Sequence, residues 1–499
     1  MRRAATLLGV AALALAGCGD DGGSGSPLDN ALGYLAEDAP LVVMIDTDLD
    51  GGQFGAANDI AERFPVGGGI EEQLEGQFEG GEVSFENDVR PLLGNEFVVG
   101  ATSVTSLIDD SEDDDFVAAI EARDGDKLRE LVAKEAEESG EQNGATVYED
   151  NDGDAFAVED DTLVVAGSAE LLEGALQQRD GDGRLTEETF EDSLAGLPEE
   201  ALVKVYGDIG ALIESDEETE QARKVAWVGA IETLGLTASV QSDGIAIDFN
   251  LSTDGGDLSD DELPLASGAE APEVARADDE VGAALRGVDQ VFDFVKSTAR
   301  AIEPQQAGQI DVVLKQVEQR TGVDLEQDVL AQLAGGVSVA VQLNGDLSGI
   351  RGEPGDPRAL TRSLGELAPE LPELLGSEGG RVRTIQTDGP GGSGTIYEVT
   401  DSDGDSVSFG VVDDVFVAAE TPERAQAVAA LEPRAVEGAE GALAFSASAE
   451  AIADAALAQL GGLAGAGSLF TGPLGDLTGS VESSTDGLRG SIRLAIDER

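Results

Sequence analysis

Residues 83–89 read VSFENDV, and residues 323–329 read VDLEQDV. Both stretches have an apolar residue four positions after their last valine, Leu93 in the first and Leu333 in the second. A match between distant parts of one chain is typical of an internal duplication. It decides the expected fold, because whatever structure one copy forms, the other copy should form as well.

Two further matches follow in the same order and at similar spacing. Residues 148–166 and 397–419 each contain an acidic Asp/Asn/Gly loop followed by a hairpin with an Asp-Asp turn, and residues 236–240 resemble residues 477–481. The sequence therefore predicts two tandem homologous units, residues 28–255 and 275–499, with a linker rich in Asp, Gly, Ser, Ala and Pro over residues 256–274.

Each unit is predicted to be α+β, with an antiparallel sheet of hairpins and meanders packed against helices. Apolar residues recur at helical spacing in both units. Strand pairs are expected at residues 407–412 with 415–419 and around the Asp-Gly turns at 243–244 and 486–487. Ser168 and Thr421 are expected to cap helices. The apolar residues with helical spacing are Leu128, Leu131 and Val132 in the first unit and Leu360, Leu364 and Leu367 in the second.

The N-terminus has the pattern of an exported bacterial lipoprotein. Arg2 and Arg3 precede an apolar run of about a dozen residues, shorter than the roughly 20 that a membrane span needs, and small residues then lead to Cys18. We expect a signal peptide over residues 1–17, a lipid on Cys18 and a flexible tether over residues 18–27. The protein would then be extracytoplasmic, held to a membrane by its acyl chains. The alternative is a plain secreted protein whose signal ends in cysteine.

Composition excludes several classes of function. The net charge of −73 repels nucleic acid and anionic headgroups, so we expect no nucleic-acid partner. There is no histidine, and the single cysteine is the expected lipid site, which excludes histidine-dependent triads, histidine-ligated metals, a thiol nucleophile and intramolecular disulfides. The acidity is interpreted as a solvated surface, with a calcium-loaded or salt-adapted surface as the alternative.

Three features are similar to those of a known family: the Phe/Leu-Glu-x-Asp-Val-x-x-x-Leu element, residues 31–40 (ALGYLAEDAP) and the terminal antiparallel segment. On these features the chain resembles an uncharacterised bacterial envelope family, domain of unknown function 3352, over most of its length after the signal. The resemblance implies export and duplication. It assigns no activity, cofactor or catalytic residue.

Two acidic loops are candidates for calcium, because they place carboxylates at alternate positions around a glycine. A tight calcium loop has a bidentate acid at its twelfth position. Counting from Asp150, the twelfth residue is Asp161, but a strand and a turn intervene; counting from Asp401, it is Val412. We therefore interpret them as solvated hairpin turns and predict no cofactor. The candidate residues are Asp150, Asp152 and Asp154 in the first unit and Asp401, Asp403 and Asp405 in the second.

Two classes of function stay open. The favoured one is a non-catalytic envelope protein that binds a ligand or protein partner between two homologous halves, as a carrier of an apolar molecule or as a structural surface protein. The other is a hydrolase that uses carboxylates or a bound cation. A deep apolar cavity would favour the carrier, a filled core the structural role, and converging buried carboxylates the enzyme.

Overall fold

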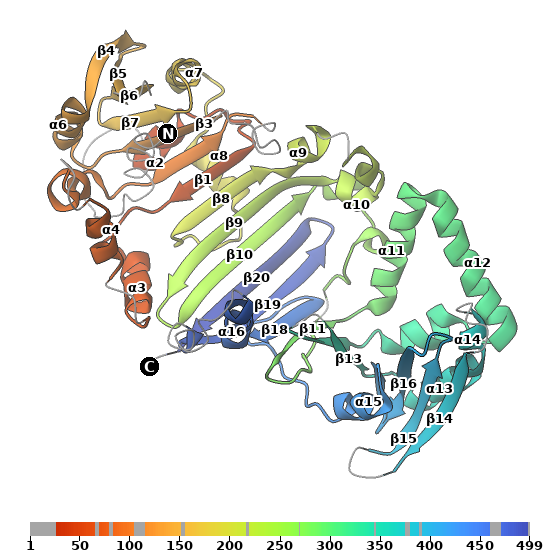
Figure 1. The fold of residues 1–499 in the computed structure, drawn as a ribbon. Coiled ribbons are helices and arrows are strands. Elements are labelled where there is room, and N and C mark those ends of the chain that lie inside the picture. The colour runs from red at the N-terminus through yellow and green to blue at the C-terminus, as the bar shows by residue number, and fades with distance from the viewer. Residues whose placement is uncertain are drawn as a thin grey trace. The chain divides into compact units, whose positions relative to one another are not determined.

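The computed structural model describes residues 26–64, 69–78, 83–103, 115–150, 155–215, 219–268, 270–343, 346–374, 380–388, 392–459 and 471–497. The chain forms two units (Figure 1). Unit 1 comprises Met1–Glu220, Ile231–Ser252 and Ile496–Arg499, and unit 2 comprises Gln221–Ala230 and Thr253–Ala495. Among the described residues, no helix is both long enough and apolar enough to cross a bilayer.

The elements of unit 1 alternate between helices and groups of strands. In chain order they are α2 (Pro27–Leu32), β1 (Leu41–Ile45), α3 (Gly52–Ala61), α4 (Ile70–Phe78), η1 (Phe85–Val89), η2 (Arg90–Leu92), β2 (Phe97–Ala101), β3 (Phe116–Glu121), α6 (Gly125–Glu135), β4 (Ala136–Gln142), β5 (Ala145–Asp150), β6 (Ala155–Glu159), β7 (Thr162–Ala166), α7 (Ala169–Arg179), α8 (Glu187–Ser193), β8 (Val203–Asp208), α9 (Ile209–Ser215), β9 (Ile231–Gln241) and β10 (Gly244–Thr253). The turn η3 (Thr219–Lys224) and the short helix α10 (Ala226–Gly229) stand between α9 and β9.

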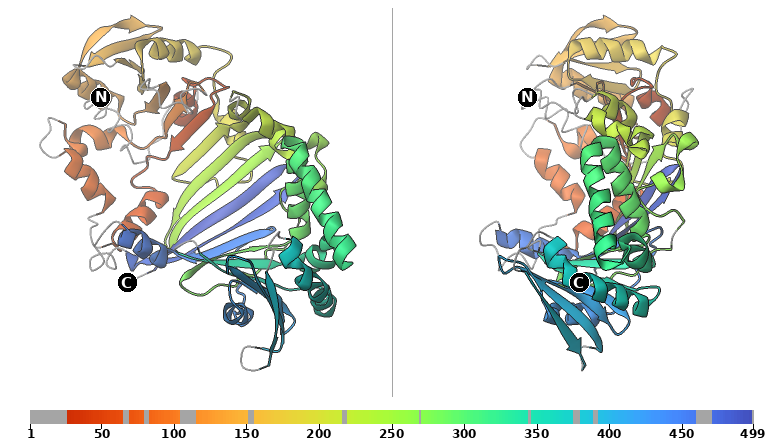
Figure 2. Two further views of the ribbon diagram at one scale, coloured as in Figure 1. Left: turned by 45° about the vertical axis from the view of Figure 1, so that its right-hand side comes forward. Right: turned by 90° about the vertical axis from the view of Figure 1, so that its right-hand side faces the viewer.

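Unit 2 repeats this alternation. Its elements are η4 (Gly255–Asp257), η5 (Asp260–Glu262), β11 (Glu280–Leu285), α11 (Val288–Ile302), α12 (Pro304–Thr321), η6 (Glu326–Leu330), η7 (Ala331–Leu333), β12 (Val337–Gln342), β13 (Leu347–Gly352), α13 (Pro357–Leu367), η8 (Ala368–Glu370), α14 (Leu371–Leu374), β14 (Arg381–Thr387), β15 (Gly394–Thr400), β16 (Ser406–Val412), β17 (Val415–Ala419), α15 (Pro422–Ala429), β18 (Leu443–Ser448), α16 (Ala449–Gln459), β19 (Leu474–Ser484) and β20 (Gly487–Ile496). Helices α11 and α12 lie side by side in every view (Figures 1 and 2).

The strands of the two units have the same neighbours. In unit 1 the order across the sheet is β4-β5-β6-β7-β3-β2-β1-β8-β9-β10. In unit 2 it is β14-β15-β16-β17-β13-β12-β11-β18-β19-β20. Adding ten to each strand number of unit 1 gives the order of unit 2. The predicted α+β class with antiparallel sheets is confirmed.

The predicted helix starts follow from local chemistry. Ser168 Oγ accepts a hydrogen bond from the N–H of Leu171, and Thr421 Oγ1 accepts one from Arg424, so both cap their helices as expected. Asp413 and Asp414 have φ of 48° and 65°, the left-handed conformation that a two-residue hairpin turn requires.

The repeated sequence element forms a π-helical turn in each unit, η1 and η6. Asp88 Oδ2 accepts a hydrogen bond from the N–H of Ser84 at 2.8 Å, and Asp328 Oδ2 accepts one from Asp324 at 2.9 Å. In unit 1 the turn also buries the side chain of Phe85. The acid of the element therefore closes its own turn, which gives the element a structural role.

The sheet of unit 1 carries a hydrophobic core on each face. One core joins α3, α4, η1 and α6 to the strands and includes Phe54, Leu74 and Phe97. The other joins α2, α7 and α8 to the strands and includes Val42 and Phe190. Side chains alternate across a strand, so neighbouring residues of β1 and β2 enter different cores.

Candidate functional site

The most distinctive surface of unit 1 is an apolar face on strands β2, β1, β8, β9 and β10. All of its side chains are half-buried rather than buried. We call it the apolar face; its residues are Val99 of β2, Leu41, Val43 and Ile45 of β1, Val203 and Val205 of β8, Leu234, Leu236, Ala238 and Val240 of β9, and Ile245, Ile247, Phe249 and Leu251 of β10.

Strand register places these side chains on one side of the sheet. Val43 lies opposite Val99 on β2 and opposite Val205 on β8. Val205 in turn lies opposite Leu236 on β9. Residues that face each other across antiparallel strands share a side of the sheet, so these four form one row across it.

Hydrogen bonds on the opposite side fix the orientation of β10. The hydroxyls of Thr233 and Ser252 are 2.6 Å apart. Two residues further along β9, the N–H of Gly235 donates a hydrogen bond to Asn250 Oδ1 at 3.0 Å. Side chains alternate along a strand, so Leu251 lies on the same side as Leu234.

Exposure on β9 is the reverse of the usual pattern. An antiparallel sheet with one solvated side normally buries its apolar residues and exposes its polar ones. Here Thr237 and Ser239 are 1% and 5% exposed, whereas their neighbours Leu236 and Val240 are half-buried. The side that carries leucine and valine is therefore the more open one.

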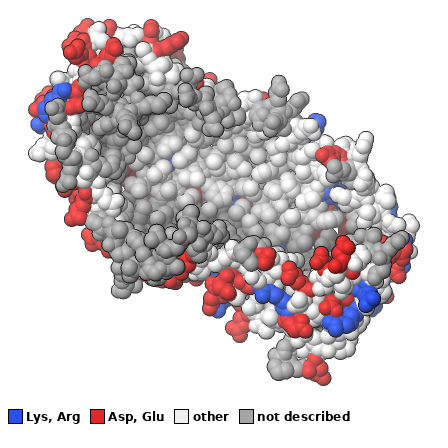
Figure 3. All heavy atoms as spheres, viewed as in Figure 1, with Lys and Arg blue, Asp and Glu red and all other residues white. Residues whose placement is uncertain are grey.

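One end of the apolar face is covered, and few charged side chains lie over the remainder. Ile45 and Val99 pack against the core of α3 and α4, and Gln53 of α3 accepts a hydrogen bond from the N–H of Val240. Over β8, β9 and β10 the space-filling view shows very few Lys, Arg, Asp or Glu side chains (Figure 3). In a chain with 102 acidic residues, this uncharged area is unusual.

A hollow of about 290 Å³ lies on another part of unit 1, between α7, the segment 34–39 that precedes β1, the end of β2 and the start of β3. Its wall includes Tyr34, whose hydroxyl donates a hydrogen bond to Glu159 at 2.7 Å. Burial and this neighbouring carboxylate raise the pKa of Tyr34. Other lining residues are Leu35, Ala39, Ala101, Val117, Leu171 and Ala175.

A larger polar hollow of about 640 Å³ is lined by Arg90, Arg123 and Arg129. Arg90 forms ion pairs with Asp50, Glu71 and Glu86, and Arg129 pairs with Asp126 and Asp161. Because carboxylates already neutralise these two guanidinium groups, the hollow does not have the charge of an anion site.

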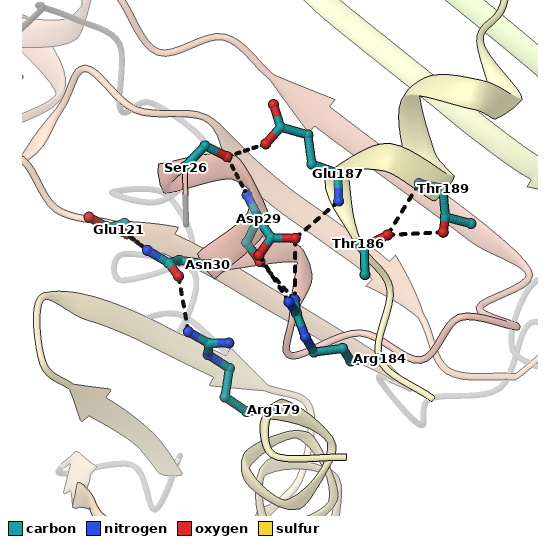
Figure 4. A network of polar contacts seen from close by, with 9 residues as sticks. All are labelled: Ser26, Asp29, Asn30, Glu121, Arg179, Arg184, Thr186, Glu187 and Thr189. Atoms are coloured by element: carbon teal, nitrogen blue, oxygen red, sulfur yellow. Dashed lines mark hydrogen bonds and ion pairs between the residues drawn. The ribbon is translucent and has the colours of Figure 1, made fainter. Parts of the chain in front are cut away.

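A polar network fixes α2 and α8 (Figure 4). Arg184 holds the carboxylate of Asp29 through both guanidinium NH₂ groups, at 3.0 and 3.3 Å. Asn30 links Glu121 to Arg179, and Ser26 caps α2 while it also donates a hydrogen bond to Glu187. The network ties the first described helix to the rest of unit 1.

Two carboxyl groups converge where β1 ends and β2 begins. Asp46 follows Ile45, Glu96 precedes Phe97, and these two strand residues are register partners. Burial raises the pKa of Glu96, and the charge of Asp46 adds to the increase. Burial also raises the pKa of Asp46, although its Oδ1 accepts a hydrogen bond from the N–H of Asp48. A pair of carboxyl groups with raised pKa values has the chemistry of a candidate acid/base site.

The second candidate calcium loop lies between β15 and β16 and is closed by its own backbone. Asp401 Oδ1 accepts hydrogen bonds from the N–H groups of Asp403, Gly404 and Asp405, at 2.8–2.9 Å. That oxygen is therefore engaged in a turn. Over the described ranges, no group of three or more His, Cys, Asp or Glu is arranged to hold a metal ion.

The structure describes no side-chain contacts for the other candidate site residues. Cys18, Asp152 and Asp154 lie outside the described residues, and Asp150 is described only as the last residue of β5. The apolar face was not predicted from the sequence, although a signal for it exists. Apolar residues alternate at Leu234 and Leu236 and again at Ile245 and Ile247, which indicates one apolar side on each strand.

Comparison with known proteins yields one family and a partial structural likeness. No curated protein matches the chain. Crystal form III of TP0453 is similar at 9% identity and a TM-score of 0.26, over 46% of this chain and 82% of that one. Crystal form I of TP0453 gives 11% identity and the same TM-score, over 44% and 78%. A family model matches residues 3–352, which is most of the chain. This protein therefore belongs to the family described as protein of unknown function DUF3352.

Proposed function

We propose that this protein is a non-catalytic, extracytoplasmic lipoprotein that binds an apolar ligand on the apolar face of unit 1. The reversed exposure of β9 is the observation that carries the proposal. Leucine is normally placed on the buried side of an antiparallel sheet. On β9 the buried side chain is Thr237, whereas Leu236 is only half-buried, so packing within the unit does not explain the leucine. A ligand that covers the leucines on this side of the sheet would explain it.

The energetics allow a reversible carrier. Apolar patches with a function commonly measure about 300–600 Å². A ligand that removes about 400 Å² of apolar surface from water gains roughly 10 kcal/mol. Association costs at least about 4 kcal/mol, which leaves an affinity between millimolar and micromolar. An acyl chain or another flat hydrocarbon fits a face that offers no charged partner.

The N-terminal pattern supports the location. A lipid on Cys18, joined to the folded chain by the short segment before α2, would keep the protein beside a membrane, where apolar ligands are available. The matching strand orders of the two units support their origin by duplication, as the repeated sequence elements do.

The test is a fluorescence titration with N-phenyl-1-naphthylamine, an uncharged dye whose emission rises in apolar surroundings. The chain from Gly19 onward should bind the dye saturably. Leu236→Asp should weaken binding at least tenfold, because the carboxylate would have to lose water against the dye. Leu236→Trp fills the same space without adding a charge and should also weaken binding.

Two control variants make the result specific. Thr237→Val changes the adjacent residue on the opposite side of β9 and should leave the dye affinity unchanged. Val407→Asp places the same charge at an apolar side chain that is 43% exposed on β16 in unit 2. If both Leu236 variants bind like the controls while they melt like the native chain, the apolar face is not the site and a structural role is favoured.

One observation supports the alternative of carboxylate-dependent hydrolysis, the convergence of Asp46 and Glu96. A raised pKa lets a carboxyl group act as a general acid at higher pH. A hydrolytic activity lost in Glu96→Gln, in a variant that still binds the dye, would favour the enzyme over the carrier.

A further inference from the structure

The helical hairpin of α11 and α12 in unit 2 leaves an apolar surface open to solvent. Of the described large hydrophobic side chains, five are exposed, and three of these are on this hairpin. They are Val295 of α11, at 54%, and Val312 and Val313 of α12, at 63% and 51%.

Val295 belongs to an apolar stripe that runs along α11. Val288, Val291, Val295 and Ile302 are separated by three, four and seven residues, and Phe292 lies four residues after Val288, which places all five on one side of the helix. Even so, no residue of this helix is buried. Charged residues stand between the apolar ones, so the helix is amphipathic with an apolar side that is only partly covered.

Helix α12 extends the open surface beside α11. The two helices are separated by a single residue, Glu303, and their contact is fixed by the ion pair of Arg300 with Asp311 at 2.9 Å. Val295 lies eight residues before the turn and Val312 nine after it, so the antiparallel helices bring them to the same level.

The corresponding helices of unit 1 behave differently. Helices α3 and α4 also stand between the first strand of their unit and its π-helical turn, yet they bury Phe54, Ile60 and Leu74. In unit 2, α11 has no buried residue, and the buried side chains among the described residues of α12 are Ala307 and Val317. The large apolar side chains at this position are therefore more completely covered in unit 1 than in unit 2. The topology does not require the open surface of α11 and α12.

Charge decides between possible occupants of this surface. Residues 288–321 contain five acidic and four basic residues, whereas the whole chain has 102 and 29. A second copy of the chain would bring another net charge of −73 towards the first, which opposes self-association. An uncharged apolar layer meets no such repulsion.

Three of the four cations of the hairpin are paired with neighbouring acids, and the fourth, Lys315, is exposed. Lys296 pairs with Asp293 and Glu326, Arg300 pairs with Asp311, and Arg320 of α12 pairs with Glu373. A surface that recognises anionic headgroups needs a cluster of available cations. This hairpin therefore fits a membrane surface with no net charge.

We propose that the α11–α12 hairpin docks on the surface of a phospholipid bilayer with zwitterionic headgroups. Val295, Val312 and Val313 enter the boundary between headgroups and acyl chains, where an amphipathic helix buries its apolar side. This contact acts in addition to a lipid on Cys18 and is separate from the apolar face of unit 1.

The single tryptophan of the chain makes a selective experiment possible. Trp227 is 8% exposed, so a Trp227→Phe background removes the native indole signal and leaves the hairpin unchanged. In this background, Val312→Trp in the chain from Gly19 onward should show a saturable blue shift with phosphatidylcholine vesicles, and brominated acyl chains should quench it. Val407→Trp, at another exposed valine, should show neither effect.

Sedimentation with vesicles measures the affinity. The double variant Val295→Asp, Val313→Asp should lower the partition coefficient for phosphatidylcholine at least tenfold, because two exposed valines lose their apolar contact with lipid. Its melting temperature should equal that of the native chain, since neither side chain is buried. Vesicles of phosphatidylglycerol should bind less well than phosphatidylcholine at low salt.

Three results would overturn the proposal: an equal emission shift for Val407→Trp, an unchanged partition of the double variant, or preferential binding to phosphatidylglycerol. A dimer that forms without vesicles and dissociates in the double variant would instead identify a second copy as the occupant. The double variant should keep native affinity for N-phenyl-1-naphthylamine, so failure here and failure of the carrier function are distinguishable.

Discussion

Replacing Arg184 by methionine tests whether the network around α2 stabilises unit 1. Arg184 donates hydrogen bonds to both carboxylate oxygens of Asp29. The side chain of Arg184 is 25% exposed and that of Asp29 is 21% exposed. Hydrogen bonds to charged groups contribute about 1.5–3 kcal/mol. Partial exposure to solvent lowers that figure, so Arg184→Met should cost about 1–2 kcal/mol. For a domain of 150–250 residues the melting temperature should fall by roughly 2–8 °C.

The same ion pair gives the prediction a pH dependence. Burial by itself would raise the pKa of Asp29, but the hydrogen bonds from Arg184 and from the N–H of Glu187 outweigh it and lower the pKa. A carboxyl group with a lowered pKa contributes stability above its unfolded pKa of about 3.9, and this contribution is lost as pH falls through the folded pKa. The penalty of Arg184→Met should therefore be largest near pH 7 and disappear in acid.

Urea unfolding at a series of pH values from 7 downward measures this difference between the variant and the native chain. The matched control is Arg434→Met, because Arg434 is 75% exposed and lies 3.7 Å from Asp278, itself 93% exposed. Surface pairs of this kind contribute little, so the control should lose less than about 0.5 kcal/mol. A loss for Arg184→Met that equals the control, or one that stays constant down to pH 3, would refute the reasoning.

Three other predictions concern the anchor and the turns. Cys18→Ser should abolish acyl labelling and release the chain from membranes; unchanged retention on fractionation would contradict the anchor. Asp414→Gly should raise the free energy of unfolding by about 0.5 kcal/mol in urea, because glycine adopts the φ of 65° without strain, whereas Asp403→Gly should bring no gain. Calcium, magnesium and sodium at matched ionic strength should shift the melting temperature similarly, since Asp401 Oδ1 is engaged by backbone N–H groups. A calcium-selective gain near 2.7 kcal/mol at a hundredfold excess over Kd, lost when Asp401 and Asp405 become Asn, would show specific binding.

Local features of the fold could be predicted because their causes are local. The hydroxyl of Thr421 reaches an N–H three residues on, and the left-handed turn at Asp413 depends on two residues only. The periodic leucines of α13 are buried as expected, since Leu360, Leu364 and Leu367 recur at helical spacing. Such features need no knowledge of what packs against them.

The apolar face could not be predicted, because the sequence does not show which side of the sheet the rest of the fold leaves uncovered. Alternation shows that Leu234 and Leu236 share one side of β9 with Ala238, but alternation is the same for a covered side and an open one. Only the folded chain shows that Thr237 is the buried neighbour. The carboxyl pair of Asp46 and Glu96 could not be predicted for another reason, because no spacing singles out these two among 102 acidic residues. These two meet through strand pairing.

The two units show how one topology can present different surfaces. Strand order and the π-helical turn closed by Asp88 or Asp328 are common to both, so these features are needed for the fold itself. The open stripe of α11 has no counterpart in α3, where Phe54 is buried. A surface that differs between equivalent positions is not required by folding, and an exposed apolar surface is costly in water unless something covers it. Hence the proposed membrane contact is supported by a difference between the units, the open apolar surface of α11 and α12, and not by what the units share.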